Sequence, residues 1–236
     1  RQRWRRSSCQ GKPRRDKQMA SVALADDHGR APQQSRSRET QARIVRAAES
    51  LFAERGYDGT TVQDITMRAR CSVGSFYARF KDKESLFLHI HDQHCAELLQ
   101  RMEFLCDLFE AENSRLDIVV HQIVRALFVF AGKRRTLTRV FMQRSADDPA
   151  FQARYATVWK QVQDLLQAAL LRRRGEIKVP NPERAVAFTL QCLHGLWAND
   201  VLHYPTHDIT GQISGEALAA EATEACLAWL GVAGKR

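Results

Sequence analysis

Apolar residues recur at helical spacing in the first third of the chain. Positions i, i+4, i+7 and i+8, which form one face of an amphipathic helix, are filled by Ile44, Ala48, Leu51 and Phe52. This spacing predicts a helix that begins near Glu39. It should end before Gly56, because glycine readily adopts the left-handed conformation that terminates helices.

Two short helices and a longer one are predicted next. Thr61 can cap a helix of about Val62 to Arg70, and Gln63 or Asp64 can close a capping box. A second capping residue, Ser72, precedes a helix predicted over 73–80, and Asp82 caps a fourth helix. Two short helices joined by a three-residue turn and packed on a longer first helix describe a helix-turn-helix unit.

The rest of the chain keeps the helical period and shows no strand-like alternation. Pro149 and Pro182 each follow a good capping residue, where a first-turn proline belongs. The predicted helices cover about 83–110, 115–132, 134–145, 149–174, 182–203 and 214–230. The expected fold class is therefore all-α, with an N-terminal helix-turn-helix three-helix domain at residues 39–82 and a larger C-terminal helical bundle at 83–236.

The positive charge is concentrated at one end of the chain. The formal net charge is +9, and residues 1–38 hold 11 Lys and Arg against 3 acidic residues. Little in this segment can be buried, so we predict a disordered basic tail over 1–38. The tail is either simply solvated or an arm that adds phosphate contacts to a nucleic acid. The first methionine is Met19, which leaves open whether residues 1–18 belong to the natural protein.

Composition disfavours a membrane or secreted protein. The longest stretch without a charged residue, 185–199, is shorter than the ~20 apolar residues that span a bilayer. No apolar run follows the basic N-terminus, so we expect no signal peptide. The 6 cysteines include no C-x-x-C pair, which indicates reduced thiols. We therefore expect a cytoplasmic location and no contact with a membrane.

The strongest signal is a motif that runs from residue 56 to residue 86. It reads GYDGTTVQDI over 56–65 and ARCSVGSFYARFKDKESL over 69–86. Over about residues 40–90 the chain closely resembles the DNA-binding domain of the TetR family of bacterial transcriptional repressors. Four residues depart from the usual family pattern: Thr66 replaces alanine, Arg70 and Cys71 replace glycine and valine, and Arg79 replaces His or Tyr. The rest of the chain agrees with the family in length and helix count only.

The third predicted helix has the pattern that DNA reading requires. A helix that enters the major groove presents small or polar side chains outward and buries an apolar back. Phe76 and Phe80 form that back, with Val73 nearer the helix start. Ser75 and Tyr77 point away from it, and glycine at position 74 permits close approach to a duplex.

The resemblance implies a set of residues that face double-stranded operator DNA. Gln63 can pair with adenine and Arg79 with guanine or a phosphate, while phosphate contacts fix the orientation of the domain. The alternative is that Tyr77 and Arg79 are solvated residues of a small helical core. The phosphate contacts expected are Thr61, Tyr77 and Lys83. The full expected set is Thr61, Gln63, Ser72, Val73, Gly74, Ser75, Tyr77, Arg79 and Lys83.

The resemblance also implies a homodimer that places two reading helices one helical turn apart on a palindrome. The last two helices of the C-terminal domain are then the dimerisation surface. The alternative is that their apolar rows fill the core of one chain. The rows are Val186, Leu190, Leu193, Trp197, Val201, Leu218, Ala222, Ala225 and Trp229.

By the same resemblance, the middle helices hold a pocket for a small lipophilic or aromatic effector. Effector binding shifts the fourth helix, separates the reading heads and releases DNA. Plain core packing explains the same aromatic residues equally well. The expected lining is Phe104, Leu108, Phe128, Phe141, Tyr155, Trp159 and Phe188, with His121, Met142 and Gln143 supplying polarity.

Two side hypotheses concern histidine and cysteine. With His89 nearby, His91, His94 and Cys95 have a helical spacing that can chelate zinc or copper, or they form a polar helix face. Cys71 is either a redox switch or a small apolar filler of the turn. We expect the second interpretation in both cases, and hence no metal and no cofactor.

The pattern favours a TetR-like DNA-binding transcriptional regulator, a homodimeric repressor released by a small effector. The alternative is a TetR-like activator, or a protein controlled by a protein partner. An all-α enzyme is disfavoured, because the sequence has no H-E-x-x-H, G-x-S-x-G or G-x-x-x-x-G-K-[ST] motif and no E-x-x-H pair.

Overall fold

The computed structural model describes residues 30–203, 213 and 215–232, and this part of the chain forms helices and no strand. The all-α fold class predicted from the sequence is confirmed. The helices are α1 (Arg30–Arg55), α2 (Val62–Arg68), α3 (Val73–Tyr77), α4 (Lys83–Ala111), α5 (Leu116–Lys133), α6 (Arg135–Asp147), α7 (Pro149–Leu171), the 3₁₀ turn η1 (Arg174–Glu176), α8 (Pro182–His203) and α9 (Gly215–Trp229). Within the described ranges, no helix is both long enough and apolar enough to cross a membrane.

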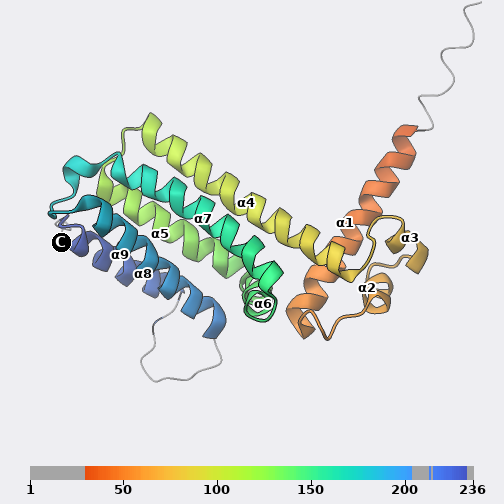
Figure 1. Cartoon of the computed structure of the whole chain (residues 1–236). Coiled ribbons are helices and arrows are strands. Elements are labelled where there is room, and N and C mark those ends of the chain that lie inside the picture. Colours follow the sequence, from red (N-terminus) through yellow and green to blue (C-terminus); the bar gives the residue numbers. More distant parts are fainter. Residues whose placement is uncertain (1–29, 204–212, 214, 233–236) are drawn as a thin grey trace, which may run out of the picture.

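The helices form a small head and a larger bundle joined by α4. Figure 1 shows α1, α2 and α3 at one end of the molecule and α5, α7, α8 and α9 at the other. The longest helix, α4, begins in the head and runs along the bundle (Figure 1). α6 lies where head and bundle meet and packs against α1, α7 and α8. Two helices, α4 and α6, therefore connect the two parts.

The head has its own apolar core, to which α6 and α7 contribute. Phe52, Phe76 and Phe87 from three different helices are fully buried there. Phe141 of α6 and Phe151 of α7 pack on Phe87, with ring centroids 5.4 Å from it in both cases. A shift of α6 is thus felt directly by the head. The core of the head also includes Leu86, Phe87 and Ile90 from the first turns of α4.

The bundle core is larger and draws on α4, α5, α7, α8 and α9. It is built from aliphatic side chains at helical spacing, for example Leu116, Val119 and Ile123 along α5, all fully buried or nearly so. α5 is the central helix and packs against α4, α8 and α9. The predicted helices of this region agree with the observed ones to within a few residues.

The start of α1 and the end of α3 differ from the sequence prediction. α1 begins at Arg30, so the expected disorder is wrong for residues 30–38, while residues 1–29 lie outside the described part of the chain. Arginine is a good helix former, and Ser37 is held by hydrogen bonds from Arg79. α3 ends at Tyr77 rather than Phe80, because the chain turns there to reach the cap of α4 at Asp82.

Candidate nucleic-acid interface

The start of α2 is a closed capping box. Thr61 Oγ1 accepts a hydrogen bond from the Asp64 amide at 3.1 Å, and the Asp64 carboxylate accepts from the Thr61 amide at 3.1 Å. The sequence left Gln63 or Asp64 as the closing residue, and Asp64 fills that role. The Thr61 hydroxyl also donates to Asp64 at 2.6 Å, and these bonds lower the pKa of the Asp64 carboxyl. Gln63 stays exposed and free to face a partner.

The turn between α2 and α3 explains one departure from the family pattern. Arg70 has φ 51°, the left-handed conformation that a glycine adopts without strain. The Cys71 amide donates to Thr66 O at 3.0 Å and the Arg70 amide to Met67 O at 3.2 Å, which is a Schellman termination of α2. Arg70 therefore keeps the geometry of the turn at some conformational cost. Cys71 packs half-buried against the head core, as a filler would.

α3 presents a polar face with a buried apolar back. Ser72 caps it, accepting from the Ser75 amide at 3.1 Å. Phe76 is fully buried and Phe80 is 6% exposed, whereas Tyr77 is 55% exposed. Val73 is 42% exposed, so it lies on the outer face and not in the buried stripe beside Phe76.

Gly74 stands on the same outer face. A Cβ atom placed there meets only Ser72 Oγ, at 3.9 Å. Nothing within the described chain therefore requires glycine at this position. The space in front of it is available to a duplex, which is the reason for close approach that the sequence suggested.

The two cations predicted to touch DNA, Arg79 and Lys83, form hydrogen bonds within the head. The Arg79 guanidinium donates to Ser75 O at 2.7 Å and to Ser37 O and Ser37 Oγ at 3.3 and 3.1 Å. Lys83 Nζ donates to Tyr57 O at 2.8 Å and Thr60 O at 2.9 Å. The carbonyls of Tyr57 and Thr60 lie in the α1–α2 loop outside any helix, and they accept the hydrogen bonds of Lys83. Arg79 thus braces α3 against α1, and Lys83 braces the loop against α4.

A charged cluster links the head to α6. The Tyr57 hydroxyl donates to Glu84 Oε2 at 2.5 Å, and burial together with this carboxylate raises the pKa of Tyr57. Arg144 of α6 lies 3.6 Å from Glu84 and 4.8 Å from the centre of the Tyr57 ring. Arg144 also pairs with Asp148 at 2.8 Å. The position of α6 is therefore coupled to the loop that supports α2.

Sequence reasoning missed exposed residues that flank the reading helix. Met67 of α2 is 75% exposed and stands one helical turn after Gln63. Arg36 and Arg38 are exposed on the first turns of α1, next to Ser37. Helical periodicity places Met67 on the face of Gln63, so spacing is a signal that could have found it. No signal marked Arg36 and Arg38, because their segment was taken as disordered.

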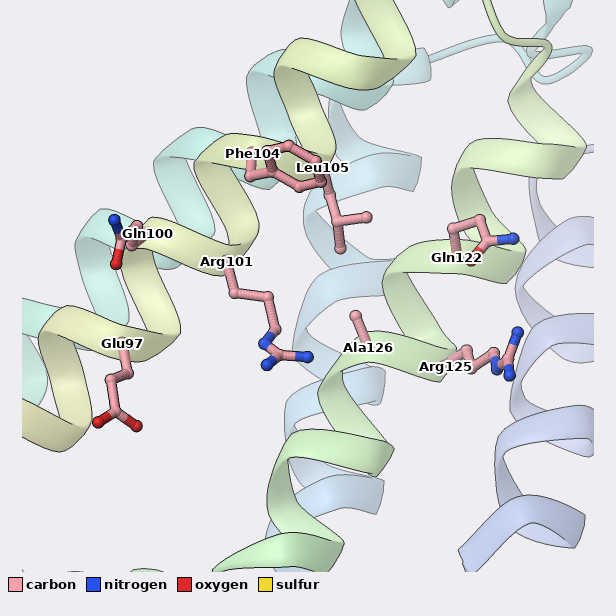
Figure 2. Close-up of a pocket in the computed structure, with 8 residues that line it drawn as sticks. All are labelled: Glu97, Gln100, Arg101, Phe104, Leu105, Gln122, Arg125 and Ala126. Carbon is pink, nitrogen blue, oxygen red and sulfur yellow. The ribbon is translucent and has the colours of Figure 1, made fainter.

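An open cleft between α4 and α5 has a volume of about 690 Å³. Figure 2 shows Leu105 of α4 and Ala126 of α5 turned toward the gap, and Arg101 reaching from α4 toward α5. Phe104 lies on the α4 rim, and Arg125 lies on the far side of α5 (Figure 2). Glu97, Gln100 and Gln122 complete the lining. A second cleft of about 580 Å³ lies between α5 and α9 and is lined in part by His121 and Phe128.

A third cavity lies inside the protein and is small. Its volume is about 20 Å³, enough for a water molecule. Phe141, Tyr155 and Trp159 line it together with His91 and His94. Burial raises the pKa of Tyr155 and lowers that of His94, so both side chains are neutral at pH 7.

The residues expected to line one effector pocket do not come together. They divide among three spaces: Phe141, Tyr155 and Trp159 line the interior cavity, His121 and Phe128 line the α5–α9 cleft, and Phe104 lines the α4–α5 cleft. Leu108, Phe188 and Gln143 are exposed, and Met142 packs on the bundle core. Helical spacing identified apolar faces but not which face of each helix meets the same space, so the single-pocket prediction is wrong for most of its members.

The predicted dimer rows are mostly internal to one chain. The bundle core contains Val186, Leu190, Leu193, Trp197, Val201 and Ala222, and Leu218 packs against it half-buried. Of the predicted rows, Trp229 at 52% and Ala225 are exposed. Each row is the apolar side of an amphipathic helix, and burial of that side forms the bundle core of the same chain. The exposed apolar residues of α8 and α9 are instead Phe188, Leu196 and Trp229, and the rings of Phe188 and Trp229 lie 4.9 Å apart.

The histidine and cysteine residues of α4 form a buried polar cluster. His91 Nε2 lies 3.4 Å from Cys95 Sγ, and His94 Nε2 lies 3.3 Å from Thr138 Oγ1. His89 packs on Phe80 at 5.4 Å. Burial raises the pKa of Cys95 to about 12, which keeps the thiol protonated. Within the described residues, no three His, Cys, Asp or Glu side chains are grouped so that they can hold a metal ion.

Comparison with known proteins identifies the head. Residues 44–90 match the family model of bacterial regulatory proteins of the tetR family. The chain is 37% identical over 95 residues to the transcriptional repressor DhaR of Mycobacterium sp., covering 40% of this chain and 43% of DhaR. It is 27% identical over 131 residues to the repressor AcnR of Corynebacterium diphtheriae, covering 55% of this chain and 60% of AcnR. The chain thus spans less than two thirds of these relatives.

Solved structures agree over most of the chain. A TetR-family regulator from Mesorhizobium loti superposes with a TM-score of 0.67 at 22% identity, covering 85% of this chain and 99% of the other. The regulator FadR from Bacillus subtilis, solved with stearoyl-CoA, gives 0.65 at 20% identity, covering 80% and 98%. At these identities the likeness establishes the fold of head and bundle.

Proposed function

We propose that the chain is a transcriptional repressor that binds operator DNA as a homodimer, because residues 44–90 match the family model of bacterial regulatory proteins of the tetR family. The observation that carries this proposal is the geometry of α3. Its apolar back, Phe76, is fully buried, and Tyr77, Val73 and Gly74 stand on an outer face that the described residues leave open. A short helix of this kind fits the major groove.

The residues that we propose as DNA contacts form two groups: side chains on the open outer face of the head, and side chains that are already hydrogen-bonded within it. Gln63, Val73, Ser75 and Tyr77 are the base-reading and phosphate-binding side chains on the outer face. Arg79 and Lys83 act first as braces that hold α3 and the α1–α2 loop in place, at the distances given above. The exposed Arg36 and Arg38 add phosphate contacts beside α3.

The dimer that we propose forms through the exposed sides of α8 and α9. Phe188, Leu196 and Trp229 are large apolar side chains without cover in a single chain. Paired across a two-fold axis, they form a four-helix contact. Replacing Trp229 by glutamate should convert the dimer to a monomer in sedimentation velocity, whereas the same change at exposed Met67 on the head should leave the dimer intact.

Release of DNA, as we propose it, passes through α4 and the α5–α6 junction. Arg134 Nη1 lies 3.3 Å from Glu49 of α1, and Arg134 Nη2 lies 3.2 Å from Glu97 of α4. An effector that displaces α4 therefore pulls on the head through Arg134. The neighbour solved with stearoyl-CoA supports a small effector with an apolar body.

The experiment that tests this function begins without a known operator. Random-sequence duplexes are selected on the full chain, and the enriched sequence is sequenced and titrated by fluorescence anisotropy. We expect a palindrome with half-sites about one helical turn apart and two chains bound per duplex. Failure to enrich any sequence, or enrichment of a single half-site with one chain bound, would contradict the proposal.

A further inference from the structure

Exposed apolar side chains stand at and near the α4–α5 cleft, of which Phe104 lines it directly. Phe104 is 66% exposed, and Leu108 one turn further along α4 and Ile118 at the start of α5 are also exposed. Because α4 and α5 are consecutive and antiparallel, these three residues lie toward the same end of the helix pair. Exposed apolar groups gathered in a concave place mark a binding surface more often than scattered ones.

Among the described residues, Arg101 reaches into the gap of the cleft without a counterion, and Arg125 stands on the far side of α5. Arg101 and Arg125 are both exposed, and neither forms an ion pair or side-chain hydrogen bond with any residue that the structure describes. Other arginines of the bundle are engaged: Arg154 with Asp92, and Arg173 with Glu110. The one acidic lining residue, Glu97, is already paired with Arg134. The cleft therefore has an unbalanced positive field.

The volume of the α4–α5 cleft also makes it a better candidate for a ligand site than the interior cavity. Its volume of about 690 Å³ is in the range of small-molecule sites, roughly 300–1,000 Å³. The interior cavity beside Tyr155 and Trp159 holds about 20 Å³. Admitting a ligand there requires separating packed aromatic rings, for example Trp159 and Trp197 at 4.5 Å.

We propose that the α4–α5 cleft is the effector site and that its ligand is an amphipathic organic anion, a carboxylate with an apolar tail. The carboxylate binds Arg101, with Arg125 adding to the positive field, and the tail lies over Leu105 toward Phe104. This inference rests on the proposed function for its biological meaning, but the binding itself does not. A bound carboxylate stands one helical turn from Glu97, so it repels the carboxylate that holds Arg134, the residue that also binds Glu49 of the head.

The test is a calorimetric titration of the DNA-free full chain with three probes of equal tail length: decanoate, decanol and decylamine. We expect decanoate to bind about tenfold or more tightly than decanol, since a charge-assisted hydrogen bond is lost with the headgroup, and decylamine to bind most weakly. Equal binding of decanoate and decanol would overturn the assignment of an anion.

Matched variants locate the binding. Arg101→Gln and Phe104→Ala should each weaken decanoate binding about tenfold. Arg184→Gln, an exposed arginine of α8, and Met67→Ala, an exposed apolar residue of the head, should leave it unchanged. Equal loss in these two control variants, or no loss at Arg101 and Phe104, overturns the site. If Phe104→Ala changes the sedimentation coefficient, the face joins copies of the chain and the ligand proposal fails.

These outcomes are independent of DNA binding. If the cleft fails to bind decanoate while the selected palindrome is still bound, the effector proposal alone is wrong. If no palindrome is selected but decanoate binds through Arg101, the site stands and the regulatory function is wrong.

Discussion

Arg173 is a buried cation that joins the end of α7 to the connection between α4 and α5. Its side chain is 8% exposed and follows the last turn of α7. The guanidinium donates to Ser114 O at 2.7 Å, Phe109 O at 2.9 Å and Ala169 O at 2.8 Å, and to Glu110 Oε1 at 2.9 Å. One side chain thus ties α7 to the connection between α4 and α5. Arg173→Met keeps an unbranched apolar stem and removes every donor.

The cost of this change follows from the groups that it leaves behind. Phe109 O still accepts from the Ser114 amide, but Ser114 O and Ala169 O lose the donor recorded for them. Each buried carbonyl left without a donor costs about 1–3 kcal/mol, and the ion pair with Glu110 is lost as well. We expect Arg173→Met to lower the free energy of unfolding by about 3–5 kcal/mol. For a chain of this length, that is a fall in Tm of about 6–20 °C.

The adjacent arginine supplies a matched control. Arg172 is 56% exposed and lies 3.4 Å from the same Glu110 carboxylate. Arg172→Met should cost less than about 0.5 kcal/mol, because exposed ion pairs contribute little. Both variants are compared by thermal and urea unfolding followed by circular dichroism at 222 nm. If the two differ by less than about 1 kcal/mol, the reasoning from orphaned carbonyls is wrong.

Three further changes probe other parts of the account. Arg70→Gly should raise Tm by about 1–4 °C in thermal unfolding, because the relief of a left-handed arginine exceeds the entropy cost of glycine; a lower Tm would refute the strain at the turn. Burial lowers the pKa of His94 to about 3. As the pH decreases below about 6.5, the unfolded chain therefore binds more protons than the folded chain, and the free energy of unfolding decreases. His94→Gln should therefore flatten the decline of Tm between pH 7 and pH 5, and an unchanged slope would exclude His94 as its cause. Gly74→Ala should leave Tm within about 2 °C, because a Cβ there meets only Ser72 Oγ at 3.9 Å among the described residues, but it should weaken operator binding if a duplex approaches this face closely; unaltered affinity would show that no close approach occurs there.

Local pattern was enough to predict the framework of the fold. Thr61, Ser72 and Asp82 cap the helices that their sequence context predicted, because capping depends on residues three positions apart. The same holds for the buried back of α3 at Phe76 and Phe80. Gly56 adopts φ 74° at the end of α1, as the termination of that helix required.

Contacts between residues that are far apart in the sequence could not be predicted from local spacing. Arg79 is drawn to Ser37, 42 positions earlier, and Arg134 to Glu49, 85 positions earlier. Neither partner is marked by spacing, so the bracing contacts of Arg79 and Arg134 could be seen only in the folded structure. The pocket and dimer residues failed for a related reason. Periodicity shows which side of a helix is apolar, and that side faces the core of the same chain.

The central claim is that the outer face of α3 reads DNA, and Tyr77 tests it most directly. Operator affinity of Tyr77→Ala is measured by fluorescence anisotropy on the selected palindrome, beside Phe104→Ala, an exposed aromatic residue far from the head. Losing a hydrogen bond to a phosphate in each half of the dimer predicts a loss of about tenfold or more for Tyr77→Ala, with unchanged helicity and oligomeric state. Phe104→Ala should bind as the parent does. If Tyr77→Ala retains the parent affinity, α3 is not the reading helix.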